Sequence, residues 1–528
     1  MSATTATAPA PADTAPAHVP LVGATLALGA IGVALATFMN VLDTSVANVS
    51  LPTIAGDLGA SVNQGTWVIT SFGVANAISM PLTGWLTLRF GSVRLFIASV
   101  LSFVLTSWLC GLAPTLPALI AFRVLQGLVA GPMIPLSQTL LMSSFPRAKA
   151  DTGLAIWAMT ALVAPVAGPL LGGWITENMA WPWIFYINVP VGLAAAAVVW
   201  PIYRGRETPT RRLRIDGVGL ALLVVWVGAL QILLDKGNEL DWFNSDTVVL
   251  LAVVALVAFL FFLAWELTDA QPIVDVRLFG RRNFAIGTAA LSVGFLLYFG
   301  NIVLLPLWLQ EHLGYTATTA GVALAPVGVL AIVLSPLVGR NIARFDPRLL
   351  ATVSFVVFAL VFAVRAHATP QDDLWTVMMP TIIQGGGLAF FMTPLMSLTL
   401  SGIEPSRVAA ASGLSNFARI SAGAFGTSIA TTVWDQRATL HHAHLVEQLG
   451  ANTDTGPLAQ TWSSLSAGGL SAEQIAAVIN QTVDAQAFTR AADDVFLGSA
   501  LLFVAMITLI WLAKPVKGVA PAEGGVAH

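Results

Sequence analysis

The sequence predicts an all-α protein that crosses a membrane many times. Of its 528 residues, 56% are hydrophobic, only 10% are charged, and the mean hydropathy is +0.80. One soluble core cannot enclose that much apolar surface. The apolar residues also fall into separate runs of about 20, the helical length that spans a bilayer. Fourteen runs are predicted as transmembrane helices, at residues 25–48, 63–87, 93–112, 117–141, 153–176, 183–203, 216–234, 247–267, 284–308, 318–339, 349–366, 375–401, 407–433 and 495–513.

Along the chain these helices form blocks of six, two and six. Residues 1–20 are rich in Ala, Pro and Thr and contain no Lys or Arg, so we expect a disordered tail rather than a cleavable signal. The first six helices occupy residues 21–203. A linker with two inserted helices follows at 204–283. The last six helices occupy 284–514, before a second tail at 515–528.

The basic residues predict the orientation of the helices. With both termini on one side, 18 of the 24 Lys and Arg residues fall in the loops and tail of that side. Two lie within helices, and the opposite side has four, namely Lys236, Arg365, Arg437 and Arg490. Because Lys and Arg are enriched in cytoplasmic loops, both termini are expected in the cytoplasm. A net charge of −3, distributed in this way, indicates no binding to nucleic acid.

An internal repeat appears at an offset of 255 residues. Seven identical residues recur at this offset, with Leu58, Gly59, Pro81, Leu82, Gly84, Arg89 and Phe90 matching Leu313, Gly314, Pro336, Leu337, Gly339, Arg344 and Phe345. They occupy equivalent places in a helix–loop–helix unit, which predicts two six-helix halves in parallel orientation. Such halves are typical of transporters that rock about a central site. Composition bias is the alternative explanation of the matches.

Two charged residues lie deep within predicted helices. Asp43 is the only charged residue between Gly23 and Gly56, and Arg123 lies six residues from the outer end of its helix. At 1.5 Å per residue their depths are roughly 12 and 9 Å, so the two can share one layer. A carboxylate at such depth costs about 3 kcal/mol and usually has a function. Alternation between a nearby cation and a desolvated pocket would let it bind and release a proton. A structural hydrogen bond for Asp43 and interface anchoring for Arg123 are the alternatives.

The first inner loop combines glycines with arginines. We expect Gly84, Arg89, Gly91 and Arg94 to form a latch, because glycines permit close helix packing and arginines can pair with carboxylates or helix ends. An ordinary positively charged inner loop is the alternative.

The fifth helix carries closely spaced glycines and prolines. Its relevant residues are Pro165, Gly168, Pro169, Gly172 and Gly173. Glycines four apart allow another helix to approach closely, and Pro169 favours a bend, which suits a gate. Small-residue packing without gating is the alternative.

Residues 434–494 form the longest outer segment, of mixed polarity with several turn signals. Ser471 to Gln474 resembles a helix start, and Ile475, Val478 and Ile479 would share one apolar face. Such faces can bind a partner or pack on the rim of the protein itself.

Together these segments resemble the ordered motifs of the fourteen-helix drug:proton antiporters of the major facilitator superfamily, and most closely the EmrB-type multidrug exporters. The similarity covers nearly the whole chain. Its motifs are Leu42-Asp43-Thr44 to Leu51-Pro52, the loop from Gly84 to Arg94, the helix with Arg123, the helix with Gly168 to Gly173, Trp183 to Pro190, Gly205 to Thr208, Leu240 to Phe243 and Ser412 to Phe417.

The resemblance implies a major facilitator fold, the proton gradient as energy source without a cofactor, and export of hydrophobic drugs across the bacterial inner membrane. It also implies two partners, a periplasmic adaptor of the EmrA-type membrane fusion class and an outer-membrane channel, for which 434–494 is the largest outer contact segment. The expected substrate cavity contains Phe38, Met39, Asn40, Trp67 and Gln126. Transport of another small hydrophobic metabolite is the alternative.

The chain departs from the wider superfamily pattern at two positions. Leu88 stands where an acidic residue is usual in the first inner loop, so a latch that depends on that acid is in doubt. Thr381 stands near where the second half would repeat Arg123. The ionic residues are therefore expected mainly in the first half.

Other classes of function find little support in the sequence. An enzyme within the membrane would need a nucleophile and base or a metal cluster, yet all seven His residues lie outside the predicted helices. No Walker-type phosphate loop is present. The single cysteine, Cys110, excludes an intrachain disulfide. His441, His442 and His444, with Glu447, fit a solvated helix face better than a metal site.

Overall fold

The computed structural model describes residues 20–60, 62–146, 149–211, 214, 216–237, 240–450 and 457–515, and within these ranges it contains helices and no strand. The predicted tails lie outside the described residues apart from Pro20 and Pro515. The α-helices are α1 (Gly23–Asp57), α2 (Val62–Gly65), α3 (Trp67–Ser79), α4 (Thr83–Phe90), α5 (Ser92–Gly111), α6 (Leu116–Ala130), α7 (Met133–Ser144), α8 (Ala150–Asn178), α9 (Trp183–Tyr186), α10 (Asn188–Tyr203), α11 (Gly217–Lys236), α12 (Asp246–Thr268), α13 (Arg282–Leu307), α14 (Ala317–Leu324), α15 (Val327–Asn341), α16 (Pro347–Arg365), α17 (Leu374–Leu400), α18 (Val408–Gly450), α19 (Pro457–Ala467) and α20 (Ala472–Trp511).

The helices have the length and composition of membrane spans. Eleven helical segments among the described residues are long and apolar enough to cross a membrane. The most apolar of them, α12, leaves Leu250, Leu260 and Phe261 more than half exposed, as expected for side chains that face lipid. The all-α polytopic class is therefore confirmed, while the number of fourteen spans stays a prediction.

Several predicted runs are divided in the structure. The runs expected as single helices but divided are 63–87, 117–141, 183–203 and 318–339. Pro81, Pro132 and Pro326 lie at three of the breaks. Proline lacks an N–H donor and its ring clashes with the carbonyl four residues earlier, so the helix is interrupted there. Three of these runs still form single apolar segments long enough to cross a membrane, at Leu116–Ser144, Trp183–Tyr203 and Thr319–Gly339.

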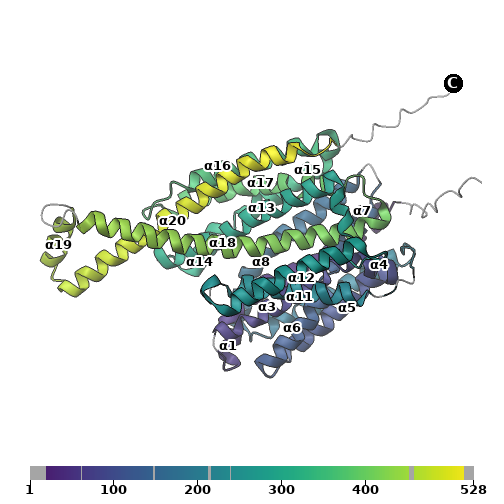
Figure 1. Ribbon diagram of the computed structural model, residues 1–528, viewed down its shortest axis with the longest axis horizontal. Coiled ribbons are helices and arrows are strands. Elements are labelled where there is room, and N and C mark those ends of the chain that lie inside the picture. Colours follow the sequence, from purple (N-terminus) through teal and green to yellow (C-terminus); the bar gives the residue numbers. More distant parts are fainter. Residues whose placement is uncertain are drawn as a thin grey trace, which may run out of the picture.

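The two halves lie against each other in the bundle, with α1 to α10 largely below and α13 to α20 largely above in the view of Figure 1. A Cβ atom added to Gly84 would lie 2.4 Å from the Cβ of Ala410 in the second half. A Cβ added to Gly339 would lie 2.3 Å from the Cβ of Ala155 in the first half. Gly339 stands 255 residues after Gly84, and Ala410 stands 255 residues after Ala155. The repeat is thus visible as two equivalent contacts between the halves.

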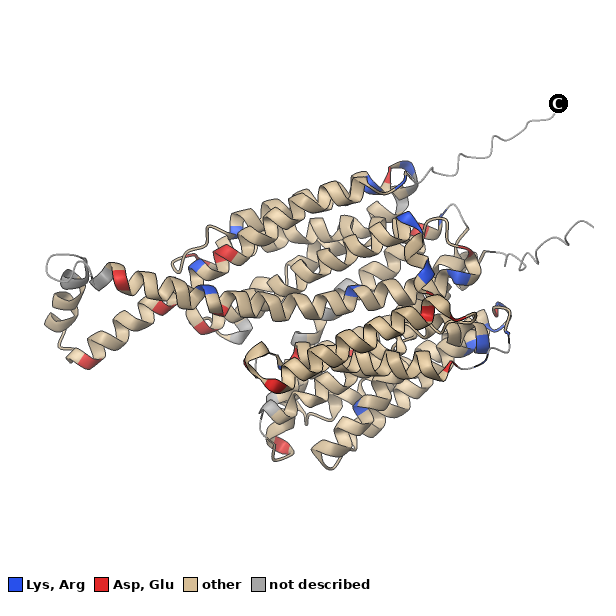
Figure 2. Cartoon of the chain, viewed as in Figure 1, with Lys and Arg blue, Asp and Glu red and all other residues tan. Residues whose placement is uncertain are grey.

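Both contacts lie at the end of the bundle where α1 begins and α20 ends, which we call the termini end. Lys and Arg residues gather at this end (Figure 2), in agreement with the predicted loop asymmetry. Asn416 of α18 adds a buried polar contact between the halves, since its Nδ2 donates to Gln138 Oε1 of α7 at 2.9 Å. The halves are therefore closed against each other on this side.

The inserted pair α11 and α12 packs beside the bundle and touches both halves. Lys236 at the end of α11 donates from Nζ to Thr66 Oγ1 at 2.6 Å, just before α3. Ser428 of α18 donates to the carbonyl of Leu234 at 2.8 Å. Lys236 is buried at the helix end rather than in an open outer loop as expected.

The segment 434–494 is mostly helical, because α18 and α20 continue beyond the bundle as an antiparallel hairpin with α19 at its tip (Figure 1). Its base is held by two contacts. The indole of Trp434 donates to the carbonyl of Phe488 at 2.9 Å, and Arg437 pairs with Asp494 at 2.6 Å.

The predicted start of the last helix is present as a capping box. Ser471 Oγ accepts from the backbone N–H of Gln474 at 3.3 Å, and Gln474 Oε1 accepts from the N–H of Ser471 at 2.9 Å. Ile475 is buried, whereas Val478 is 39% exposed, so the expected apolar face is only partly covered.

Candidate functional site

Asp43 and Arg123 form a fully buried ion pair in the first half. Arg123 Nη1 lies 2.6 Å from Asp43 Oδ2, and both side chains are at most 1% exposed. Helix α1 supplies the carboxylate and α6 supplies the guanidinium, at the shared depth that the sequence predicts. Because two separate buried charges would each be costly, the pair is the arrangement that allows both to stay in the interior.

Two amides complete the shell of the carboxylate. Asn188 of α10 donates from Nδ2 to Asp43 Oδ1 at 2.7 Å, and Gln126 of α6 donates from Nε2 to the same oxygen at 3.2 Å. Both amides also donate to Ser107 Oγ, at 3.1 and 2.6 Å. Asp43 therefore accepts three hydrogen bonds, which is the environment of an ionised carboxylate.

Arg123 is held by the neighbouring helices as well. Its Nε donates to the carbonyl of Val68 at 3.0 Å, and Nη1 donates to Gln126 Oε1 at 2.7 Å. The guanidinium carbon lies 4.2 Å from the centre of the Phe72 ring and 5.5 Å from that of Phe185. Within the described part of the chain, Nη2 has no hydrogen-bond partner. The site thus joins α1, α3, α5, α6, α9 and α10.

Helix α8 packs on α1 directly beside this pair. A Cβ added to Gly168 would lie 2.2 Å from Ser45 Oγ, and one added to Gly172 would lie 3.1 Å from atoms of Val46. Gly173 faces open space. The side chains of Pro165 and Pro169 lie outside the described residues. The close approach that two of the glycines permit is present, and their role as a gate stays a prediction.

The loop from Gly84 to Arg94, which is predicted to form a latch, contacts a carboxylate from a distant segment. Glu207, in the linker after α10, accepts from the backbone N–H groups of Val93 and Arg94 at 3.0 and 2.9 Å, and so caps α5. Its carboxylate lies 4.0 Å from the Arg94 side chain. Gly91 has φ +90°, and a Cβ there would lie 2.4 Å from the Glu207 carboxylate. Glu207 thus supplies a carboxylate to the loop that has Leu88 at the usual acidic position.

The second half caps its equivalent helix with its own residue. Asp346, which stands 255 residues after Gly91, accepts from the backbone N–H of Arg348 at 2.9 Å. The Arg348 guanidinium lies 2.6 Å from the same carboxyl, and its hydrogen bonds hold the pKa of Asp346 below the usual value. Both halves therefore place a carboxylate at the same helix start, from different parts of the chain. Arg89, the remaining latch residue, lies 5.5 Å from the Trp85 ring centre.

The expected cavity residues have different surroundings. Gln126 belongs to the shell of Asp43, and Asn40 is buried, donating to the carbonyl of Ala130 at 3.2 Å. Met39 is packed in the core against Gly192, whose missing side chain leaves room for the thioether, so it lines no open space here. Phe38 is half-buried, and Trp67 is 36% exposed.

Several functional candidates were not predicted individually. Asn188 lies in a motif that the sequence singles out, but its contact with Asp43 depends on how α10 packs on α1. Ser107 is one of many hydroxyls in apolar helices, and no spacing distinguishes it. In the second half, Arg365 of α16 donates to Thr381 at 2.8 Å. Thr381 of α17 stands near where a second arginine would repeat Arg123. An arginine from the neighbouring helix thus contacts this position.

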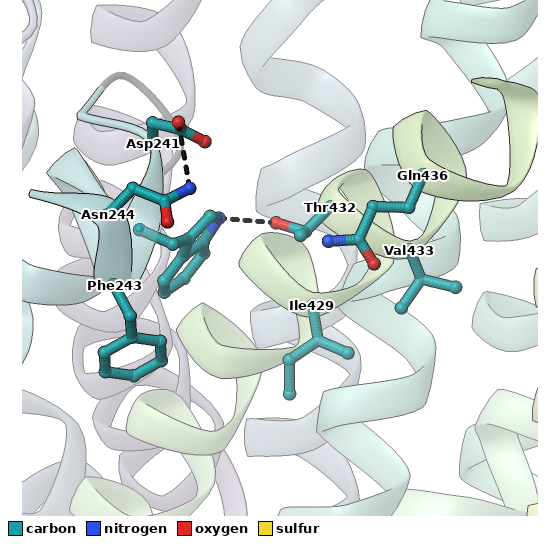
Figure 3. Close-up of a pocket in the computed structure, with 8 residues that line it drawn as sticks. Asp241, Phe243, Asn244, Ile429, Thr432, Val433 and Gln436 are labelled. Carbon is teal, nitrogen blue, oxygen red and sulfur yellow. Dashed lines mark hydrogen bonds between the residues drawn. The ribbon is translucent and has the colours of Figure 1, made fainter.

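A pocket of about 440 Å³ lies between α18 and the short 3₁₀ turn η2 (Trp242–Asn244). Trp242 donates from its indole to Thr432 at 2.8 Å across it. Figure 3 shows Thr432, Ile429 and Val433 on one side of the pocket and Phe243 on the other. Asp241 and Trp242 have positive φ, of 58° and 48°. The described residues contain no group of three or more His, Cys, Asp or Glu side chains placed to bind a metal ion. His441 and His442 instead pair with Asp494 and Asp484.

Comparisons with known proteins agree with this fold. The family model of the Major Facilitator Superfamily matches residues 33–427. The multidrug export protein EmrB of Escherichia coli strain K12 is 52% identical over 511 residues, which cover 96% of this chain and 99% of that protein. The fatty acid resistance protein FarB of Neisseria gonorrhoeae is 49% identical over 496 residues, which cover 94% and 97%.

Solved structures support the fold alone, because their sequences are distant. The human organic anion transporter MFSD10 has a TM-score of 0.59 at 13% identity, covering 90% of this chain and 99% of its own. The proton:xylose symporter XylE has a TM-score of 0.55 at 14% identity, covering 94% and 97%. The family model and the near full-length identities show that this chain belongs to the major facilitator superfamily, a family of membrane transporters rather than enzymes, and groups with the EmrB-type proteins.

Proposed function

We propose that this protein exports hydrophobic drugs from the cytoplasm across the bacterial inner membrane in exchange for protons. The names of its relatives, which refer to multidrug export and fatty acid resistance, support the export of hydrophobic compounds. The observation that carries the proton part is the buried pair of Asp43 and Arg123, surrounded by donors to the carboxylate.

Protonation of Asp43 changes the energy of this site. The carboxylate loses its charge, and the buried guanidinium of Arg123 then has no counter-charge. Removing one partner of a buried ion pair costs about 3–5 kcal/mol. A second conformation that hydrates Arg123 or moves it away from Asp43 is then favoured. The proton then has a different affinity for each of two conformations. Its binding can therefore shift the balance between them.

Helix α8 offers a path from this site to the contact between the halves. Its Gly168 lies against Ser45, two residues after Asp43 in α1. Its Ala155, near the other end of the same helix, lies against Gly339 of the second half. A displacement of α1 on proton binding would be transmitted along α8 to the closed termini end. Alternating access then follows from rocking of the two halves.

The hairpin formed by α18, α19 and α20 is the proposed contact for a periplasmic adaptor of the EmrA-type membrane fusion class. With both termini in the cytoplasm, the hairpin projects into the periplasm. Leu440, Val446 and Trp462 are at least 40% exposed on it and offer apolar contacts. The adaptor would join this protein to an outer-membrane channel.

Purified protein in proteoliposomes tests the proposal. A panel of hydrophobic compounds is added while a pH-sensitive dye reports the pH inside the proteoliposomes. Compound-dependent proton movement that disappears when the proton gradient is collapsed is the expected result. Transport of the same compounds without any proton movement would contradict proton coupling.

A further inference from the structure

A second buried arginine lies where the two halves meet. Arg419 of α18 is 5% exposed and stands 11 residues after the first residue of that helix, about 16 Å from its start. Its guanidinium carbon lies 4.2 Å from the centre of the Phe295 ring in α13 and 5.8 Å from that of Trp157 in α8. Both halves thus contribute to its surroundings.

Only neutral groups contact this charge. Arg419 Nη2 donates to Asn416 Oδ1 at 2.7 Å, and Asn416 donates in turn to Gln138 of the first half. In the part of the chain that the structure describes, no carboxylate forms an ion pair with Arg419. Arg123, by contrast, lies 2.6 Å from the carboxylate of Asp43.

The surroundings of Arg419 are rich in donors that have no acceptor. The unpartnered buried atoms on Arg419 and nearby side chains, among described residues, are Arg419 Nε, Gln138 Nε2, Trp157 Nε1 and Ser412 Oγ. Ser412, Asn416 and Arg419 follow the spacing of one helix face. The first three of these atoms carry N–H groups that can only donate, and the hydroxyl can also donate. A buried donor without a partner costs about 1–3 kcal/mol. These donors suit an acceptor, and Arg419, which forms no ion pair among the described residues, favours an acceptor that carries negative charge.

We propose that Arg419, with Asn416 and Gln138, binds the carboxylate of a lipophilic monocarboxylic acid while the protein transports it. The inference rests on the proposed export function and names the chemical class of one group of its substrates. Phe295 and Trp157 lie against the guanidinium and offer apolar surface to the part of the acid next to its head group.

The same residues close the termini end in this structure. Asn416 joins the halves through Gln138, so parting of the halves breaks that hydrogen bond and frees two more amide groups beside Arg419. A carboxylate entering from the cytoplasm would take the place of these contacts between the halves. Binding of the acid therefore favours the conformation in which the termini end is open.

Three compounds with the same chain length test the inference. Dodecanoate, dodecanamide and dodecyltrimethylammonium differ in the charge of the head group and share one apolar tail. Their binding to the purified, full-length protein in nanodiscs is measured without a proton gradient, so the result does not depend on proton coupling. Partition of each compound into lipid is measured in empty nanodiscs and subtracted.

We expect Arg419→Gln to weaken dodecanoate binding at least tenfold, about 1.4 kcal/mol, while dodecanamide binding changes less than twofold. Arg419→Lys should restore part of the preference for the acid. Arg365→Gln is the matched control, because it also removes a buried guanidinium but leaves this cluster intact, and it should keep the wild-type preference. Thermal unfolding of each variant identifies any that fail to fold. In that case Gln138→Leu, which removes the unpartnered Nε2 donor together with the acceptor of Asn416, takes the place of Arg419→Gln.

Two results would overturn the inference. Wild-type protein that binds dodecanamide as tightly as dodecanoate has no site for the carboxylate. Equal losses of all three ligands in Arg419→Gln would assign the residue to packing alone. Proton movement measured separately in proteoliposomes keeps these outcomes distinct from a failure of the export proposal.

Discussion

Gly84 lies so close to Ala410 that a Cβ atom on the glycine would be 2.4 Å from the alanine Cβ. Gly339 and Ala155 form the equivalent contact at 2.3 Å, with the roles of the two halves exchanged. The repeat therefore places a glycine at each of two matching points where the halves close.

Gly84→Val should shift the protein away from the closed termini end, because overpacking costs about 1–3 kcal/mol and parting of the halves relieves it. Gly339→Val should have the same effect. The distance between spin labels placed on the two halves at the termini end is measured by pulsed electron paramagnetic resonance. Gly228→Val in α11, where a Cβ meets no atom within 4 Å, is the control. Unchanged distances in both variants would show that these contacts do not set the conformational balance.

Gly168→Leu should abolish transport, because the new side chain would occupy the place of Ser45 beside Asp43. Gly172→Leu should have a similar but smaller effect, since its nearest atoms are 3.1 Å away. Gly173→Leu is a control on the same helix, as its position faces open space. Turnover is compared at equal expression. If Gly168→Leu and Gly173→Leu behave alike, the contact of α8 with α1 is not part of the transport cycle.

Much of this fold was predictable from the sequence, because hydropathy indicates where apolar helices lie, while the orientation inferred from Lys and Arg stays a prediction. The pairing of Asp43 with Arg123 was predictable from depth alone. The contacts of Asn188 with Asp43 and Ser107 and the contact of Glu207 with α5 were not, because each depends on packing between segments more than 80 residues apart. Met39 was assigned to a cavity because an apolar residue in a helix can face either a cavity or a neighbour, and periodicity does not separate these cases.

Glu207→Ala should destabilise the protein by about 1 kcal/mol, since it leaves the first N–H groups of α5 without their acceptor. The readout is thermal unfolding in detergent, together with transport rate. Glu404→Ala is the control, because Glu404 is 65% exposed and its nearest contact with Arg281 is 3.9 Å. Equal behaviour of the two variants would mean that Glu207 has no special role in the latch.

Replacing residues 450–485 by a short Gly/Ser linker should leave proton-coupled exchange intact in proteoliposomes, because the pair of Arg437 with Asp494 at the hairpin base is kept. Drug resistance of cells and cross-linking to the adaptor should both be lost. Cross-linking that persists would exclude the hairpin tip as the docking surface. Exchange that is lost in the isolated protein would assign the hairpin to the stability of the bundle.

The role of Asp43 in proton coupling is decided by proton movement in proteoliposomes that contain Asp43→Asn. Because this change leaves Arg123 without a counter-charge, the neutral double variant Asp43→Asn with Arg123→Gln is measured beside it as a check on folding. We predict that addition of a transported compound moves protons in wild-type protein and moves none in either variant, although both still bind the compound. Proton movement at the wild-type rate in folded Asp43→Asn protein would contradict the assignment of Asp43 as the proton-binding group.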